Sequence, residues 1–181
     1  MTDSNSVNQG KEIDIKAQLS NVKKRVADVL ELAKSLGVDG AEVSMSRQQG
    51  LSVGTRLREV ETVEFTNDGA LGITVYSGGR KGSASTADLS ENALKTTVEA
   101  AVNIAKYTSV DECSGLADKE LLNFAPADLD LYHPEIITTD KAIEIATLCE
   151  TTALACDKRI TNSDGASFSS FEGFKVYGNS H

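Results

Sequence analysis

The sequence lacks, or has little of, several residue types on which common classes of protein depend. Its 181 residues contain no tryptophan, two prolines, three cysteines and two histidines. So little proline, with no tryptophan, argues against a linker-rich chain and against a carbohydrate-binding surface. No apolar run approaches the length of a transmembrane helix, and the N-terminus is polar, without the apolar stretch of a signal peptide. We therefore expect a cytoplasmic protein that makes no contact with a membrane.

The two histidines are too few and too far apart for the usual zinc peptidase site. Such a site commonly takes two histidines one helical turn apart, with a glutamate between them. His133 lies before Pro134 in an irregular segment and His181 is the last residue, and no HExxH pattern is present. A structural or incidental role is the better interpretation of each. The sequence therefore predicts no metal-ligating residue.

The cysteines and the glycine- and serine-rich stretches predict no other reactive site. Cys113, Cys149 and Cys156 form no CxxC pair, and their odd number does not suit a disulfide framework. Gly82–Ser85 is not a GxSxG nucleophile motif, and no helix begins directly after Gly78–Gly82, as a phosphate-binding loop requires. We therefore predict no catalytic, cofactor-binding or metal-binding residue in this chain.

The charge balance is acidic. Aspartate and glutamate number 27 against 18 lysines and arginines, which gives a formal net charge of −9. A phosphate backbone repels such a chain unless a local basic patch intervenes. Lys23, Lys24 and Arg25 are adjacent, but they fall on a predicted helix, where a solvated face is the better interpretation. We expect no direct binding to nucleic acid.

What is present is an ordinary globular composition, 40% apolar and 25% charged, with room for a sizeable core. The polar residues 1–12 predict a disordered tail. A helix should follow and end before Gly37, since glycine suits the left-handed position after a helix. Its apolar residues recur at steps of three and four: Ile15, Leu19, Val22, Val26, Leu30, Ala33 and Leu36.

Two strands are expected next. Residues 41–47 alternate apolar and polar side chains, Gln48–Gly50 has the composition of a turn, and the alternation resumes at Leu51. The charged stretch Arg56–Glu64 has two interpretations. It is either an exposed edge strand or turn whose charges discourage pairing, or a rim that contacts a substrate or a partner subunit.

The central stretch gives the strongest local signals. Residues 70–76 alternate as a half-buried strand, and Asn67–Gly69 and Gly78-Gly79 predict a reversal at each end, with residues 81–86 returning as a strand. A helix capped by Asp88 or Ser90 follows. Its apolar stripe, Leu94, Val98, Ala101, Val102 and Ala105, should pack on the sheet.

The last third is expected to begin with a long connection, residues 109–135, containing a short helical turn at 119–122. A third helix should be capped by Thr138 or Thr139. Residues 159–162, 166–171 and 173–177 predict short strands. The inner face of the third helix is predicted from its apolar residues, including both cysteines as small core side chains: Ala142, Ile145, Ala146, Cys149, Ala153 and Cys156.

An ordered series of blocks resembles one known family. They are GTRLREVETVEF from Gly54, GALGITVYSGGRKGSASTADLSENAL from Gly69, AAVNIAKYT from Ala100 and DECSGLAD from Asp111. These blocks closely resemble the first domain of the PmbA/TldD family, and the PmbA branch, also called TldE, is the nearer match. The resemblance runs from about Val29 to the end of the chain. It implies an α+β fold, with helices packed on a curved, mainly antiparallel sheet in a two-layer, sandwich-like arrangement.

The resemblance also implies a function. The family is metallopeptidase-related, and residues 13–181 would form its N-terminal domain, a fragment of a longer two-domain protein. The HExxxH motif of the TldD branch matches no position here, so no catalytic residue is carried over. Zinc is expected only in a TldD-like partner subunit. The chain would bind peptide or unfolded substrates and a TldD-like subunit, or self-associate, within a proteolytic assembly.

An alternative remains at this point. The family was earlier described as a modulator of DNA gyrase. The chain could be a regulatory module without a proteolytic role, acting on gyrase or another protein through protein contacts. Its acidic balance would suit mimicry of a nucleic-acid surface.

Overall fold

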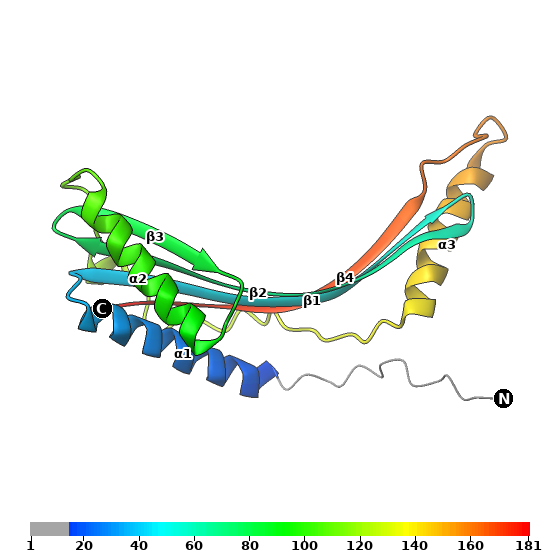
Figure 1. Cartoon of the computed structure of the whole chain (residues 1–181). Helices are drawn as coiled ribbons and strands as arrows, with labels where there is room; N and C mark the ends of the chain where they lie inside the picture. The colour runs from blue at the N-terminus through cyan, green and yellow to red at the C-terminus, as the bar shows by residue number, and fades with distance from the viewer. Residues whose placement is uncertain (1–14) are drawn as a thin grey trace, which may run out of the picture. The chain divides into compact units, whose positions relative to one another are not determined.

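The computed structural model describes residues 15–181, so the predicted tail lies outside the described residues. The described part forms a four-stranded sheet in the order β3-β2-β1-β4, with three α-helices (Figure 1). None of these helices is long and apolar enough to cross a membrane. The predicted α+β class is confirmed. The elements are α1 (Ile15–Ser35), β1 (Gly40–Arg56), β2 (Glu59–Ser77), β3 (Arg80–Thr86), α2 (Glu91–Tyr107), the 3-10 turn η1 (Lys119–Leu121), α3 (Thr139–Cys156) and β4 (Ala166–Asn179).

The sheet is antiparallel. β2 and β3 form a hairpin in which Ser77 pairs with Arg80 and Leu71 with Thr86. The turn between them, Gly78-Gly79, has φ values of 57° and 68°, which glycine adopts without steric cost. The predicted reversal at this position is confirmed.

The chain divides into two compact units that share strands β1, β2 and β4. Unit 1 comprises residues up to Ser46, Gly69–Leu129 and Phe174–His181, and unit 2 comprises Arg47–Asp68 and Asp130–Gly173. Because strands run through both, this division does not test the prediction of one domain over residues 13–181. Each unit has its own core.

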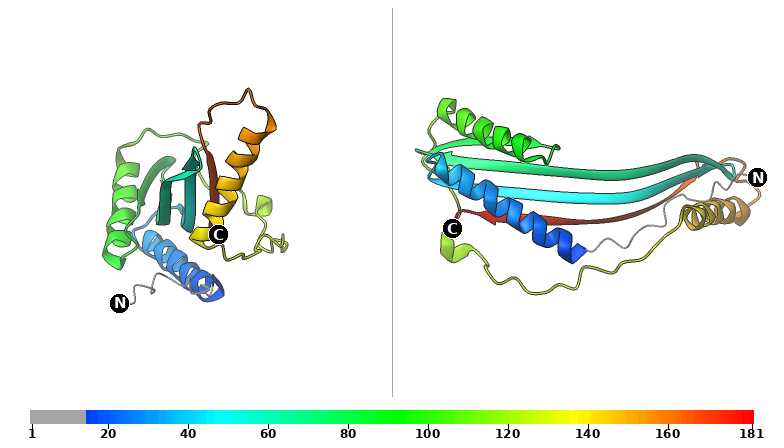
Figure 2. Two further views of the ribbon diagram at one scale, coloured as in Figure 1. Left: turned by 90° about the vertical axis from the view of Figure 1, so that its right-hand side faces the viewer. Right: turned by 60° about the horizontal axis from the view of Figure 1, so that its bottom comes forward.

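In unit 1, α1 and α2 cover one face of the sheet (Figure 2). Strand alternation directs every second side chain toward the helices, and those side chains are almost fully buried. This face therefore forms the two-layer arrangement expected from the alternation and the apolar helix stripe. Its core comprises Val22, Val26, Val29, Ala33, Ala41, Val43, Met45, Leu71, Ile73, Val75, Leu94, Val98, Ala101 and Ala105.

The helix ends in unit 1 follow local rules. Gly37 has φ 79° after α1, so its predicted left-handed conformation is confirmed. Ser90 caps α2, because its Oγ accepts a hydrogen bond from the Ala93 N–H at 3.4 Å. Asp88, the alternative cap, instead accepts the Ser90 N–H through Oδ1 at 2.9 Å.

Unit 2 has a smaller core beneath α3. Leu51 and Val53 of β1 pack with Ala142 of α3, and the partly buried side chains of Ile137, Ile143 and Phe168 surround them. Of the two threonines predicted to cap α3, Thr138 does so, accepting the Lys141 N–H through Oγ1 at 3.2 Å.

The predicted turn at Gln48–Gly50 is wrong, because β1 continues through it as one strand. Gly50 marks a close approach rather than a reversal. A Cβ atom built there would lie 2.0 Å from Cδ1 of Phe171, whose ring occupies that space. Glycine inside a strand often indicates such an approach.

Three further predictions about turns and strands are wrong. β2 runs without reversal through Asn67–Gly69, where a Cβ on Gly69 would lie 3.0 Å from Leu89 Cδ1. β4 is one strand from Ala166 to Asn179, where two short strands were predicted, and residues 159–162 are not a strand. In β4, as in β2, a glycine lies against a neighbouring element, since a Cβ on Gly173 would lie 2.7 Å from the backbone oxygen of Arg47.

Candidate functional site

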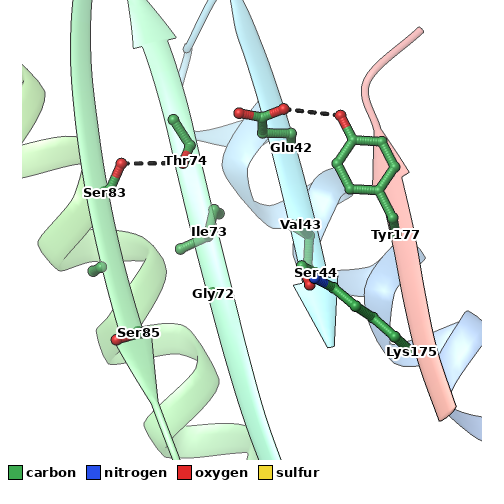
Figure 3. A pocket seen from close by; sticks show the side chains of 11 residues that line it. Glu42, Val43, Ser44, Gly72, Ile73, Thr74, Ser83, Ser85, Lys175 and Tyr177 are labelled. Atoms are coloured by element: carbon green, nitrogen blue, oxygen red, sulfur yellow. Dashed lines mark hydrogen bonds between the residues drawn. The ribbon is translucent and has the colours of Figure 1, made fainter. Parts of the chain in front are cut away.

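Unit 1 has an open groove on the sheet face away from α1 and α2 (Figure 3). Even-numbered residues of β1 and β2 point to this face, since their odd-numbered neighbours are buried beneath the helices. We call it the polar groove. It has a volume of about 490 Å³ and is lined by Glu42, Val43, Ser44, Gly72, Ile73, Thr74, Ser83, Ala84, Ser85, Lys175 and Tyr177.

Two tyrosines hold the carboxylate of Glu42 in the polar groove. The Tyr76 hydroxyl donates to Glu42 Oε1 at 2.9 Å, and the Tyr177 hydroxyl donates to Oε2 at 2.8 Å. Tyr76 is buried, whereas Tyr177 is 55% exposed. The carboxylate is therefore fixed by donors from β2 and β4, one on each side of its own strand.

The rest of the polar groove is lined by small polar side chains and one lysine. Thr74 and Ser83 share a hydrogen bond of 3.0 Å between their hydroxyls. The hydroxyls of Ser44 and Ser85 and the ammonium of Lys175 have no hydrogen-bond partner among residues 15–181. These groups can donate to and accept from a polar ligand, which makes the groove a candidate binding surface.

The Glu42 cluster predicts an unusual titration. Burial, and then the hydrogen bond and negative charge of Glu42, raise the pKa of Tyr76 from 10.0 to about 12. Because the pKa is raised in the folded state, the associated stability is fully present below pH 10 and is lost as the pH rises through about 12.

We expect Glu42→Gln to lower the Tyr76 pKa part of the way toward 10, because burial remains. Tyrosinate absorbance, with Tyr76→Phe to assign the signal, measures it; an unchanged titration would contradict the assignment to Glu42.

In unit 2, the buried Glu150 of α3 binds the tip of the β1–β2 hairpin. Its side chain is only 1% exposed, and its two oxygens accept the backbone N–H groups of Leu57 and Arg58, each at 2.8 Å. Leu57 and Arg58 have φ values of 51° and 69°, a conformation that non-glycine residues adopt at a cost. The hydrogen bond from the Arg58 N–H lowers the pKa of Glu150, whereas burial acts in the opposite direction. The hydrogen bond from the Leu57 N–H lowers this pKa further.

Strand β2 has an unpaired edge in unit 2. β3 pairs with β2 only between Leu71 and Ser77, and the described residues place no other strand on that side of β2. Residues 59–68, which we call the open edge, therefore present backbone N–H and C=O groups outward. All but Thr66 are exposed. The predicted exposed edge strand over Arg56–Glu64 is thereby confirmed from Glu59 onward, and Leu57 and Arg58 form the turn.

The two histidines belong to different units. His133 lies in unit 2, with Nε2 2.7 Å from the backbone oxygen of Asp130, and His181 lies in unit 1, with Nε2 3.1 Å from the backbone oxygen of Ala117. Within residues 15–181 no three His, Cys, Asp or Glu side chains are grouped closely enough to hold a metal ion. That this chain carries no catalytic, cofactor-binding or metal-binding residue stays a prediction.

The predicted inner face of α3 is partly wrong. Cys149, Ala153 and Cys156 are exposed, as is Cys113 in unit 1. The buried residues of α3 are Ala142, Ala146 and Glu150, spaced by four. The apolar periodicity of the sequence favoured Cys149 over the charged Glu150 for a buried position. Glu150 can be buried because the N–H groups of the hairpin tip donate hydrogen bonds to its carboxylate.

Comparison with protein families and curated proteins gives consistent matches. Residues 41–105 match the model for the PmbA/TldA metallopeptidase domain 1. The chain is 57% identical over 167 residues to the metalloprotease PmbA homolog of Haemophilus influenzae, covering 92% of this chain and 37% of the relative. It is 56% identical to the metalloprotease PmbA of Escherichia coli O157:H7, with the same coverage. The chain thus spans 37% of the length of these relatives.

Solved structures share the fold. A Bacteroides thetaiotaomicron protein, named for a proposed role as modulator of DNA gyrase, superposes with a TM-score of 0.79 at 27% identity, covering 88% of this chain and 37% of that one. TldE from Thermococcus kodakarensis superposes with a TM-score of 0.63 at 17% identity, covering 87% of this chain and 35% of that one. The second likeness shows the fold alone.

Proposed function

Because the chain belongs to the metalloprotease-related PmbA/TldD family, we propose that it is the substrate- and partner-binding domain of a PmbA-like subunit. That subunit would act in a cytoplasmic TldD/PmbA-type proteolytic assembly, in which a TldD-like partner subunit holds the zinc ion. The chain itself would contribute binding surfaces and no metal ligand.

The observation that carries this proposal is the open edge of β2. An extended polypeptide can add to such an edge as a further strand, with main-chain hydrogen bonds supplying affinity independent of most of its sequence. β2 continues from Glu59 to Ser77, while β3 covers it only from Leu71. A peptidase that degrades unfolded or peptide-like substrates needs binding of this kind, because such substrates share a backbone and not a sequence. The polar groove of unit 1 is a second candidate binding surface.

The proposal predicts that peptide cleavage requires two components. We expect the protein mixed with a TldD-like subunit to cleave an unstructured peptide several times faster than either protein alone. Chelation of zinc should abolish the activity, since the metal would be held by the partner. Hydrogen–deuterium exchange in the mixture should show slower exchange in residues 59–68 when peptide is added, because strand addition protects outward N–H groups.

Two outcomes would contradict the proposal. Full metal-dependent cleavage by the protein alone would show that it is catalytic. A mixture no more active than the TldD-like subunit would remove its role in proteolysis. In that second case, recovery of DNA gyrase but no TldD-like protein in a pull-down would favour the regulatory alternative.

A further inference from the structure

The open edge of β2 carries a concentrated negative charge. Glu59, Glu61 and Glu64 are all exposed, and none forms an ion pair with a cation among the residues that the structure describes. Asp68 adds a fourth exposed carboxylate at the end of the open edge. A strand docked there would place its side chains within reach of these unpaired charges.

The open edge also exposes large apolar side chains. Phe65 is 70% exposed, and Val60 and Val63 are 45% and 44% exposed. Val63 and Phe65 are two residues apart and therefore share one face of β2. Thr62 lies on the other face, beside Gly54 of β1, where its Oγ1 would be 2.6 Å from a Cβ built on that glycine. A docked strand with an apolar residue opposite Val63 or Phe65 would remove part of this surface from water.

We propose that the open edge selects an extended polypeptide segment of another protein in which lysine or arginine residues are interspersed with apolar ones. This inference rests on the proposed function, in that it names the chemistry of the segment that would add to β2. Main-chain hydrogen bonds hold the segment, its basic side chains pair with the three glutamates, and its apolar side chains cover Val63 and Phe65. A segment rich in aspartate or glutamate is rejected by charge repulsion.

A second copy of this chain fits the open edge less well. Edge-to-edge pairing of two copies would bring six glutamates into one short ribbon, because each copy contributes Glu59, Glu61 and Glu64. Residues 59–68 contain no lysine or arginine to compensate them. Unpaired like charges at close range oppose association, whereas a basic segment neutralises them.

The test uses three synthetic peptides with the same alternating pattern of valine and threonine. They differ only at three positions, which carry lysine, glutamine or glutamate. We expect the lysine peptide to bind the protein about tenfold or more tightly than the glutamate peptide, with the glutamine peptide between them. The preference should decrease as salt is added, because these charges are exposed. Fluorescence anisotropy measures affinity, and hydrogen exchange locates binding at residues 59–68.

A charge-reversal variant assigns the preference to the open edge. Glu59→Lys, Glu61→Lys and Glu64→Lys together should invert the order, so that the glutamate peptide binds most tightly. The matched control makes the same three changes in net charge at exposed glutamates of unit 1, by Glu31→Lys, Glu112→Lys and Glu120→Lys. This control should keep the wild-type order, since the substituted positions lie outside the open edge.

The outcomes separate the inference from the proposed function. Equal binding of all three peptides, with residues 59–68 protected, would overturn the charge selection and leave the proposed function standing. Failure of every peptide to protect residues 59–68 would overturn both. Protein that sediments as a dimer with residues 59–68 already protected would assign the open edge to a second copy and overturn the inference.

Discussion

Replacing Gly82 by alanine is expected to destabilise unit 1 severely. A Cβ atom at this position of β3 would lie 2.1 Å from the backbone oxygen of Ala101 and 2.5 Å from the backbone nitrogen of Ala105, both in α2. These are main-chain atoms, so no side-chain rotation relieves the overlap, and β3 and α2 would have to separate. Overpacking that displaces side chains and backbone typically costs about 1–3 kcal/mol, and occasionally more. We expect Gly82→Ala to cost about 3 kcal/mol or more, measured by urea unfolding.

A second glycine of the same sheet provides the control. Gly72 of β2 lies in the polar groove, and nothing is within 4 Å of a Cβ built there. Gly72→Ala should leave stability unchanged or raise it by about 0.5–1 kcal/mol, because alanine restricts the unfolded chain and suits a strand interior better. If the two alanine variants unfolded at the same urea concentration, close contact between β3 and α2 would not explain why residue 82 is a glycine.

Replacing Glu150 by alanine is expected to destabilise unit 2 more than any other change of a charged residue in α3. The substitution leaves the N–H groups of Leu57 and Arg58 without their acceptor, in a turn whose positive φ angles already carry strain. Glu150→Gln should be intermediate, because an amide keeps one oxygen acceptor but presents its NH₂ to the second donor. Hydrogen exchange of the Leu57 and Arg58 amides reports the loss directly.

Glu144→Ala is the matched control for Glu150→Ala. Glu144 lies on the same helix, but its side chain is 64% exposed and its ion pair with Lys141, at 3.0 Å, is on the surface. Exposed ion pairs contribute little to stability. An equal loss of stability in the two alanine variants would mean that helix propensity, and not the hairpin contact, explains the effect.

Acid should reproduce part of the Glu150 effect in the wild-type protein. Its pKa is held below the ordinary value of a glutamic acid, so the folded state favours the ionised form. The stability from this group is present above the unfolded-state pKa and is lost as the pH falls through the folded-state pKa. The stability difference between wild type and Glu150→Gln should therefore shrink as the pH falls through this range. A difference independent of pH would show that the carboxylate charge is unimportant.

Local sequence signals predicted most helices and the β2–β3 hairpin but misplaced several turns. Gly37 and Gly78-Gly79 do adopt positive φ, so reading them as chain reversals or helix ends was correct. Gly50 and Gly69 instead make room for Phe171 and Leu89, side chains distant in sequence. One kind of glycine is needed because the backbone has a positive φ angle, and the other because a neighbouring side chain leaves no room for a Cβ atom. The two kinds cannot be distinguished in a sequence. Only the packed structure distinguishes them.

The candidate sites could be predicted only in part. Alternation alone places Glu42 on the face opposite Val43, and the charged stretch Arg56–Glu64 correctly indicates an exposed edge strand from Glu59 onward. The Glu42 cluster also needs Tyr177, which is 135 residues away, and depends on the pairing of β4 with β1. Burial of Glu150 depends in the same way on the hairpin tip. Neither long-range pairing leaves a periodic trace in the sequence.

The uninterrupted course of β1 through both units affects how the sheet assembles. Val43 and Val53 are an even number of residues apart and both are fully buried, one in each core. If β1 slipped against its neighbours by a single residue, both would turn toward solvent together. A misaligned sheet could therefore not keep one core while losing the other. A one-residue shift of β1 would therefore cost the burial of apolar side chains in both cores at once, which favours the native alignment over its nearest alternatives.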